Sequence, residues 1–134
     1  MTDPDYEIGP FSEGHAPELA GLCQSEGWDF WDDPTAVASA MLAPGVTALV
    51  AITDDRLVGA IQVLGDGQIN WIIGALIVAP SHRGQGIGRQ LISKSFLATG
   101  AKRLDLLTED EAPAFYRRLR GREMVGFRLH PLNP

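Results

Sequence analysis

The strongest constraint on the fold is a junction between an apolar run and a glycine-rich segment in the second half of the chain. The run "INWIIGALIV" covers residues 69–78, and "APSHRGQGIGRQL" follows it at residues 79–91. The first pattern is typical of a buried strand, and the apolar spacing after the glycines indicates a helix over residues 87–99. A glycine-rich loop at a helix start presents free N–H groups and a positive dipole end to anions. The junction therefore predicts a strand, a phosphate-binding loop and a helix.

The remaining patterns predict strands and helices in the order β-α-α-β-β-β-α-β-α-β along a single domain, residues 1–134. Helices are expected over residues 15–27, 33–45, 87–99 and 108–119, and strands over residues 6–11, 46–53, 57–64, 69–78, 103–108 and 123–130. This order predicts an α/β (α+β) fold. Its mixed, mostly antiparallel sheet should contain a central, right-handed parallel β-α-β unit and carry helices on both faces.

Two helix starts carry specific capping signals. Asp33 precedes Pro34 and should cap the second helix, because aspartate favours the N-cap position and proline the first helical turn. Thr108 stands three residues before Glu111, which is the spacing of a capping box.

Composition and charge exclude several classes of protein. The net charge of −6 argues against nucleic acid as a partner, which calls for a basic surface. The longest apolar run is too short to cross a membrane, and the start "MTDPDYEIGP" lacks the pattern of a secretory signal. Cys23 is the only cysteine, and no cluster has the spacing of metal ligands. We expect a cytoplasmic protein with no metal and no membrane partner.

Three kinds of phosphate-binding loop can be compared with residues 83–88. A Walker loop needs Lys followed by Ser or Thr after its last glycine, but Gly88 is followed by Arg89 and Gln90. A dinucleotide fingerprint needs the spacing G-x-G-x-x-G, which this segment lacks. The sequence "RGQGIG" instead fits the pattern [Q/R]-x-x-G-x-G.

That pattern resembles the acetyl-CoA loop of the Gcn5-related N-acetyltransferase (GNAT) family. The continuous stretch "LIVAPSHRGQGIGRQLI", the element order and "FYRRL" after the next strand are similar to that family as well. The resemblance is strong from Val46 to Leu119 and weaker before that. It implies an acyl-CoA N-acyltransferase-like fold with acetyl-CoA as cosubstrate.

The resemblance also implies which residues bind the cosubstrate. The loop that faces the pyrophosphate in the family corresponds to residues 83–89, and the strand that faces pantetheine corresponds to residues 76–78. The implied cofactor-binding set is Leu76, Ile77, Val78, Arg83, Gly84, Gln85, Gly86, Ile87, Gly88 and Arg89. Gly86 and Gly88 should be the least replaceable of these, and His82 faces either the phosphates or solvent.

In the family, a neutral amine attacks the thioester directly and a thiolate leaves. The backbone N–H near Val78 corresponds to the oxyanion donor, and Tyr116 corresponds to the general acid. The usual acid on the strand before the loop is replaced by Ala75, which leaves the base unassigned. The base is either a water chain or one of five carboxylates, each with a surface role as the alternative: Glu26, Asp29, Asp32, Asp66 and Glu109.

The link "GWDFWDDP" between the first two helices is the expected acceptor region. Trp28, Asp29 and Trp31 would bind the substrate, because aromatic rings attract an ammonium group; core packing or a dimer contact are the alternatives for the rings. A small-molecule primary amine is the expected acceptor. A protein N-terminus or lysine, or a CoA-binding module without catalysis, remain alternatives. With one strand predicted after the last helix, an exposed sheet edge also makes a homodimer an expectation.

Overall fold

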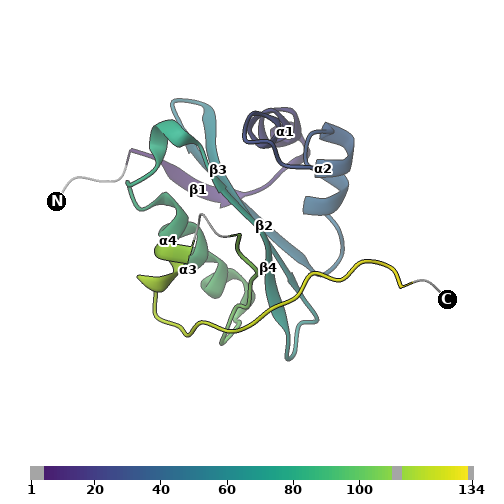
Figure 1. Ribbon diagram of the computed structural model, residues 1–134. Coiled ribbons are helices and arrows are strands. Elements are labelled where there is room, and N and C mark those ends of the chain that lie inside the picture. The colour runs from purple at the N-terminus through teal and green to yellow at the C-terminus, as the bar shows by residue number, and fades with distance from the viewer. Residues whose placement is uncertain (1–4, 110–112, 133–134) are drawn as a thin grey trace.

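The computed structural model describes residues 5–109 and 113–132, and its strands form one four-stranded sheet in the order β1-β2-β3-β4 (Figure 1). The strands are β1 (Glu7–Pro10), β2 (Val46–Thr53), β3 (Arg56–Gly65) and β4 (Trp71–Val78), and all neighbours are antiparallel. Asp54 and Asp55 join β2 to β3 with φ angles of 48° and 61°, as a two-residue hairpin turn requires. These four strands confirm the first four strand predictions.

Helices cover both faces of this sheet. The helices α1 (Ala16–Ser25) and α2 (Pro34–Met41) lie on one face, and α3 (Ile87–Thr99) and α4 (Pro113–Arg117) lie on the other (Figure 1). Short 3-10 helices precede α1 (η1, Glu13–His15) and follow β4 (η2, Pro80–His82). Because strand side chains alternate between faces, Ala60 of β3 packs against α1 and α2 while Ile61 packs beneath α3.

The ends of α1 and α2 are fixed by local hydrogen bonds. The Asp33 carboxylate accepts from the N–H groups of Thr35 and Ala36, each at 3.3 Å, which confirms the predicted N-cap. α1 ends where Gly27 adopts a φ of 73° and the Trp28 N–H donates to the Cys23 carbonyl at 3.0 Å. The link 28–33 is therefore held at both of its ends.

β4 contains a β-bulge next to the place where the segment after α3 meets it. Gln62 of β3 faces Ala75 and Val63 faces Ile73, so Gly74 is the extra residue. A bulge of this kind bends its strand and increases the local twist. The segment beyond α3 touches β4 only through a single parallel bridge between Ile72 and Asp105. One parallel bridge thus stands in place of the strand predicted over residues 103–108, and the full parallel β-α-β unit is not confirmed.

The predicted strand at residues 123–130 does not form either. A strand needs a paired neighbour, and the adjoining segment supplies only the bridge at Asp105. Residues 123–132 lie extended across the molecule with their apolar side chains exposed (Figure 1). The predicted last helix is represented by α4, and Glu111 of the expected capping box lies outside the described residues. Within the described ranges, no helix has the length and apolar character needed to cross a membrane.

Candidate active site

The outer edge of β4 presents backbone groups that β3 does not use. Val78 faces Gly59 across the ladder, and the Ala79 N–H donates to the Val58 carbonyl at 2.8 Å. In an antiparallel ladder this pattern makes Val78 and Gly59 a non-hydrogen-bonded pair, so the N–H and C=O of Val78 point away from β3. By the same alternation, those of Leu76 point outward too.

This outer edge is paired at only one of its ends. The Ile73 N–H donates to the Asp105 carbonyl at 2.8 Å, and the Asp105 N–H donates to the Trp71 carbonyl at 3.1 Å. Among the residues that the structure describes, no strand pairs with β4 beyond Ile73 on this side. Leu76 and Val78 therefore offer donors and acceptors to an extended ligand.

The glycine-rich loop follows directly after this edge. Gly84 and Gly86 have φ angles of 78° and 85°, a region that strains other residues, and open space lies where each Cβ would stand. Gly86 is the N-cap of α3 and offers no side chain to the first amides of that helix. Those amides and the helix dipole suit a phosphate group, with Arg89 exposed in the first turn.

Two other members of the predicted loop set serve the packing of the fold. Ile87 is buried in the core under β2 and β3. Gly88 is also buried, and a Cβ on it would stand 3.1 Å from Phe115 Cζ and 3.7 Å from Val78 Cγ2. Gly88 therefore lets α4 approach α3 beside the end of β4.

Tyr116 lies on α4 next to Phe115. The two rings meet edge to face with centroids 5.0 Å apart, and Tyr116 is half-buried. Burial raises the pKa of the Tyr116 hydroxyl above its ordinary value. The phenol therefore stays protonated at neutral pH, as a proton donor must.

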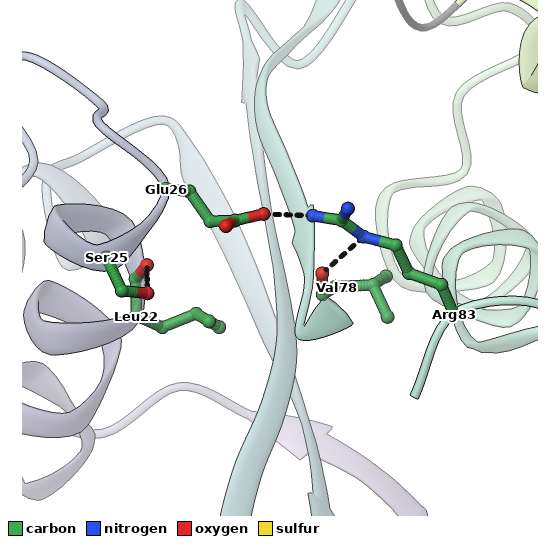
Figure 2. A network of polar contacts seen from close by, with 5 residues as sticks. All are labelled: Leu22, Ser25, Glu26, Val78 and Arg83. Carbon is green, nitrogen blue, oxygen red and sulfur yellow. Dashed lines mark hydrogen bonds and ion pairs between the residues drawn. The ribbon is translucent and has the colours of Figure 1, made fainter. Parts of the chain in front are cut away.

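Arg83 connects the loop to the opposite side of the sheet (Figure 2). Its Nε donates to the Val78 carbonyl at 3.1 Å, and its guanidinium forms an ion pair with the Glu26 carboxylate. Glu26 is the C-cap residue of α1, whose last turn also holds a hydrogen bond from Ser25 Oγ to the Leu22 carbonyl at 2.7 Å. One guanidinium thus contacts both the β4 edge and the end of α1.

A small cavity of about 10 Å³, room for about one water molecule, lies in the core on the α1 and α2 face, behind β4. Its walls include Trp28 and Trp31, whose rings lie 6.4 Å apart, together with Cys23, Gln62 and Ala75. Burial raises the pKa of the Cys23 thiol to about 11, which keeps it neutral and unreactive. The structure thus brings two of the three predicted substrate residues together in this pocket.

Gln62 is a pocket residue that the sequence analysis missed. It is buried, its Nε2 donates to the Ala40 carbonyl at 3.2 Å, and its Oε1 faces Gly74 so closely that a Cβ there would stand 2.4 Å away. The only sequence signal was one polar residue within the apolar strand pattern of residues 57–64.

The rest of the link 28–33 faces solvent. Asp29 is exposed and does not line the pocket. Its neighbour Phe30 is 90% exposed and adopts a φ of 71°, an uncommon conformation for a bulky residue. A strained backbone and an exposed ring therefore occur together beside the tryptophans.

The five candidate bases differ sharply in position. Asp66 lies in the β3–β4 turn, where the N–H groups of Ile69, Gln68 and Asn70 hold its pKa down to about 2. Glu109 is exposed and 3.9 Å from Arg128, and Asp29 and Asp32 are exposed on the acceptor link. Glu26 is the candidate that reaches the Val78 edge, through Arg83.

Two further residues named in the sequence analysis, His82 and Gln85, line a second hollow. They line it together with Asp5, Tyr6 and Asp54, and the His82 Nδ1 is 2.7 Å from Ser81 Oγ. Ile77 points the other way, into the core under α1 and α2. Within the described part of the chain, no group of three His, Cys, Asp or Glu side chains is arranged to hold a metal ion.

Comparison with known proteins identifies the class to which this site belongs. The family model of the acetyltransferase (GNAT) domain matches residues 44–119, more than half of the chain, and the chain belongs to that family. The match covers the outer edge of β4, the glycine-rich loop and α4. A comparison with proteins of curated function gives no significant match.

Solved structures share the whole fold. An aminoglycoside acetyltransferase from an uncultured soil metagenomic sample, solved with trehalose, matches with a TM-score of 0.78 and 20% identity over 98% of this chain and 99% of that one. The same enzyme has been solved with sisomicin. A ribosomal-protein-alanine N-acetyltransferase from Brucella melitensis biovar Abortus 2308 matches with a TM-score of 0.73 and 17% identity over 96% and 99%. The protein is thus a GNAT acetyltransferase in fold and family.

Proposed function

We propose that the protein is an acetyl-CoA-dependent N-acetyltransferase that acts on a primary amine of a small molecule. The observation that carries the proposal is the edge of β4 at Leu76 and Val78, which pairs with no strand among the described residues and runs directly into a glycine-rich helix start. An extended amide-bearing arm and a pyrophosphate follow one another in CoA, and the edge and the loop follow one another here in the same way.

The residues present fit that cosubstrate. The amides at residues 84–88 are unobstructed by side chains at Gly84 and Gly86, so they would hold the phosphates. The outward groups of Leu76 and Val78 would hold the pantetheine arm. When bound, acetyl-CoA supplies an acetyl group on a thioester, which an amine can attack.

The chain supplies two groups to that chemistry. The Val78 N–H points outward and would stabilise the negative charge that develops on the carbonyl oxygen. The protonated Tyr116 phenol would give a proton to the departing sulfur. These roles follow the family resemblance, and the outward direction of Val78 and the burial of Tyr116 support them.

A small cationic acceptor suits the other side of the site. Trp28 and Trp31 offer aromatic faces, and Asp29 and Asp32 add negative charge to the same link. The fold neighbours include an enzyme solved with the aminoglycoside sisomicin, which supports a polyamine-like acceptor. They also include a ribosomal-protein-alanine N-acetyltransferase, so a peptide N-terminus is the second candidate.

The first test is thermal unfolding with acetyl-CoA, with ATP and NAD as controls. A ligand that binds only the folded state raises its stability by about 2.7 kcal/mol at a hundredfold excess over its dissociation constant. We expect a rise in Tm with acetyl-CoA alone. Equal Tm values with and without acetyl-CoA would remove the basis of the proposal.

The second test measures thiol release from acetyl-CoA across a panel of acceptors. The panel contains sisomicin, simple polyamines and peptides with a free N-terminal amine or a lysine. We expect turnover with the small amines. Turnover with peptides alone would assign the second candidate, and CoA binding without any turnover would make the protein a non-catalytic CoA-binding module.

We also propose that the protein forms a homodimer through residues 123–132. Val125, Phe127 and Leu129 alternate along this extended segment and are 79–86% exposed, an arrangement that another strand would cover. Light scattering of the wild type should give twice the chain mass, and Phe127→Asp should give a monomer. A monomeric wild type would refute the dimer.

A further inference from the structure

The ion pair between Glu26 and Arg83 joins the two halves of the proposed site (Figure 2). Arg83 begins the glycine-rich loop, whereas Glu26 is the C-cap of α1 and directly precedes the link that carries Trp28 and Trp31. The Glu26 side chain is 22% exposed and the Arg83 side chain 56% exposed, so both remain within reach of a ligand.

The contacts of Arg83 occupy the very edge that the cosubstrate needs. Its Nε donates to the outward-facing Val78 carbonyl at 3.1 Å. An extended chain laid along β4 would pass the same carbonyl, and the guanidinium stands in its place. A ligand N–H that donates to this carbonyl would compete with Arg83 for it, and phosphates bound at the neighbouring amides would offer the guanidinium a stronger, bidentate partner.

The departure of Arg83 would leave Glu26 without its cation. The carboxylate would then face the end of β4 from the C-terminal end of α1, two residues before Trp28 in the chain (Figure 2). A partly buried carboxylate without a counter-ion attracts a cation strongly, because water solvates it poorly there. The ammonium group of an acceptor is such a cation.

We propose that Glu26 is the carboxylate that binds the acceptor ammonium, and that Arg83 covers it until the phosphates of CoA draw the guanidinium away. This inference rests on the proposed function and names its acceptor class as cationic. It makes cosubstrate and acceptor binding cooperative, because each ligand favours the separated form of the ion pair. Free protein presents a neutral pair to an amine, whereas CoA-bound protein presents a carboxylate.

The decisive experiment is calorimetric titration of CoA into four variants at low salt: wild type, Glu26→Gln, Arg83→Gln and the double variant. In the wild type, CoA must first break the ion pair, whose guanidinium is open to solvent and which is therefore worth up to about 1 kcal/mol. Glu26→Gln removes this competition, so CoA should bind about two- to fivefold more tightly. Glu13→Gln, at the opposite end of α1, is the charge-matched control and should bind as the wild type does.

The double variant distinguishes two explanations: competition between Glu26 and CoA for Arg83, and the effect of the Glu26 charge alone on CoA binding. With Arg83 replaced, the substitution Glu26→Gln should change CoA affinity less than it does in the wild type, because no pair remains to be broken. Equal CoA affinities in wild type and Glu26→Gln, or weaker binding by Glu26→Gln, would overturn the exchange. Failure of the wild type to bind CoA at all would instead refute the proposed function itself.

A second titration uses spermine as a polyammonium probe, with and without saturating CoA. We expect CoA to strengthen spermine binding in the wild type and to do so less in Glu26→Gln, with Glu13→Gln behaving as the wild type. An equal gain in all three proteins would assign the effect to the phosphates of CoA and would overturn the acceptor role of Glu26.

Discussion

The backbone of Gly88 lies against the ring of Phe115, so that a Cβ at residue 88 would stand 3.1 Å from Phe115 Cζ. This contact between α3 and α4 sets the position of Tyr116, the next residue along α4. We predict that Gly88→Ala pushes the ring aside and lowers stability by about 1–3 kcal/mol, the range for an overpacked core. Thermal unfolding measures the loss.

Gly121→Ala is the control for this substitution, because open space surrounds Gly121. It should change stability by less than 0.5 kcal/mol or so. Phe115→Leu combined with Gly88→Ala should restore part of the loss, since the leucine side chain is shorter. A Gly88→Ala protein as stable as the wild type would show that α4 does not rest on Gly88.

Gly86 and Gly67 form a matched pair for testing the loop. Both have positive φ, 85° and 80°, and both have open space around the position of a Cβ. Alanine at either should therefore cost a similar backbone strain, about 1 kcal/mol. Gly67 lies in the β3–β4 turn, far along β4 from the loop. We predict that only Gly86→Ala weakens CoA binding in a titration, and equal CoA affinities in the two variants would contradict the phosphate role of the loop.

Tyr116→Phe tests the general acid. We predict a fall in kcat of about 10²-fold or more with little change in CoA affinity, because the ring still packs against Phe115. Burial raises the pKa of Tyr116, so the folded state favours the protonated phenol. Any alkaline fall in kcat due to Tyr116 should thus begin above the ordinary tyrosine pKa of about 10 and be absent in the variant. An unchanged kcat would exclude Tyr116 as the acid.

Local sequence signals predicted the parts of the fold that depend on neighbouring residues. Asp33 before Pro34 identified the start of α2, and Gly27 and Gly100 identified the ends of α1 and α3, where their φ angles are 73° and 71°. The apolar runs at residues 46–53 and 57–64, with a short turn between them, identified the β2–β3 hairpin. Each of these features needs only a few consecutive residues, so the sequence alone specifies it.

Features that depend on distant parts of the chain could not be predicted in this way. The bulge at Gly74 follows from a register shift against Gln62, and the pairing of β4 with Asp105 stops at Ile73, just before this bulge. The contact of Glu26 with Arg83 joins residues 57 positions apart, and no local sequence pattern predicts it. The loop motif and the aromatic link are readable in the sequence, whereas the burial of Gln62 and the partner of Glu26 depend on tertiary packing.

The buried Cys23 thiol limits the stability of the folded protein at alkaline pH. Burial raises the pKa of its thiol from 9.0 to about 11. The unfolded chain therefore releases the proton from pH 9, whereas the folded protein holds it until about pH 11. The stability that this shift represents is complete below pH 9 and is lost as the pH rises through 11, about 2–3 kcal/mol in all.

The substitution Cys23→Ala should remove this loss of stability at alkaline pH. We expect its free energy of unfolding to fall less steeply than that of the wild type between pH 9 and pH 11 in urea titrations. At neutral pH the variant should be about 1 kcal/mol less stable, because the sulfur leaves a small cavity beside Leu19 and Met41. Parallel curves for both proteins above pH 9 would show that the thiol ionises without opening the core.

Phe30 combines a φ of 71° with a ring that is 90% exposed, and two substitutions separate these properties. Phe30→Gly removes both the strain and the ring, whereas Phe30→Ala removes the ring and keeps the strain. Because the positive φ costs a residue with a Cβ about 1–2 kcal/mol, Phe30→Gly should raise the free energy of unfolding by about 1 kcal/mol, and Phe30→Ala should not. If the ring covers the acceptor, both variants should raise the KM for the amine equally. A stability gain in Phe30→Gly with an unchanged KM in both would mean that the strained residue has no part in acceptor binding.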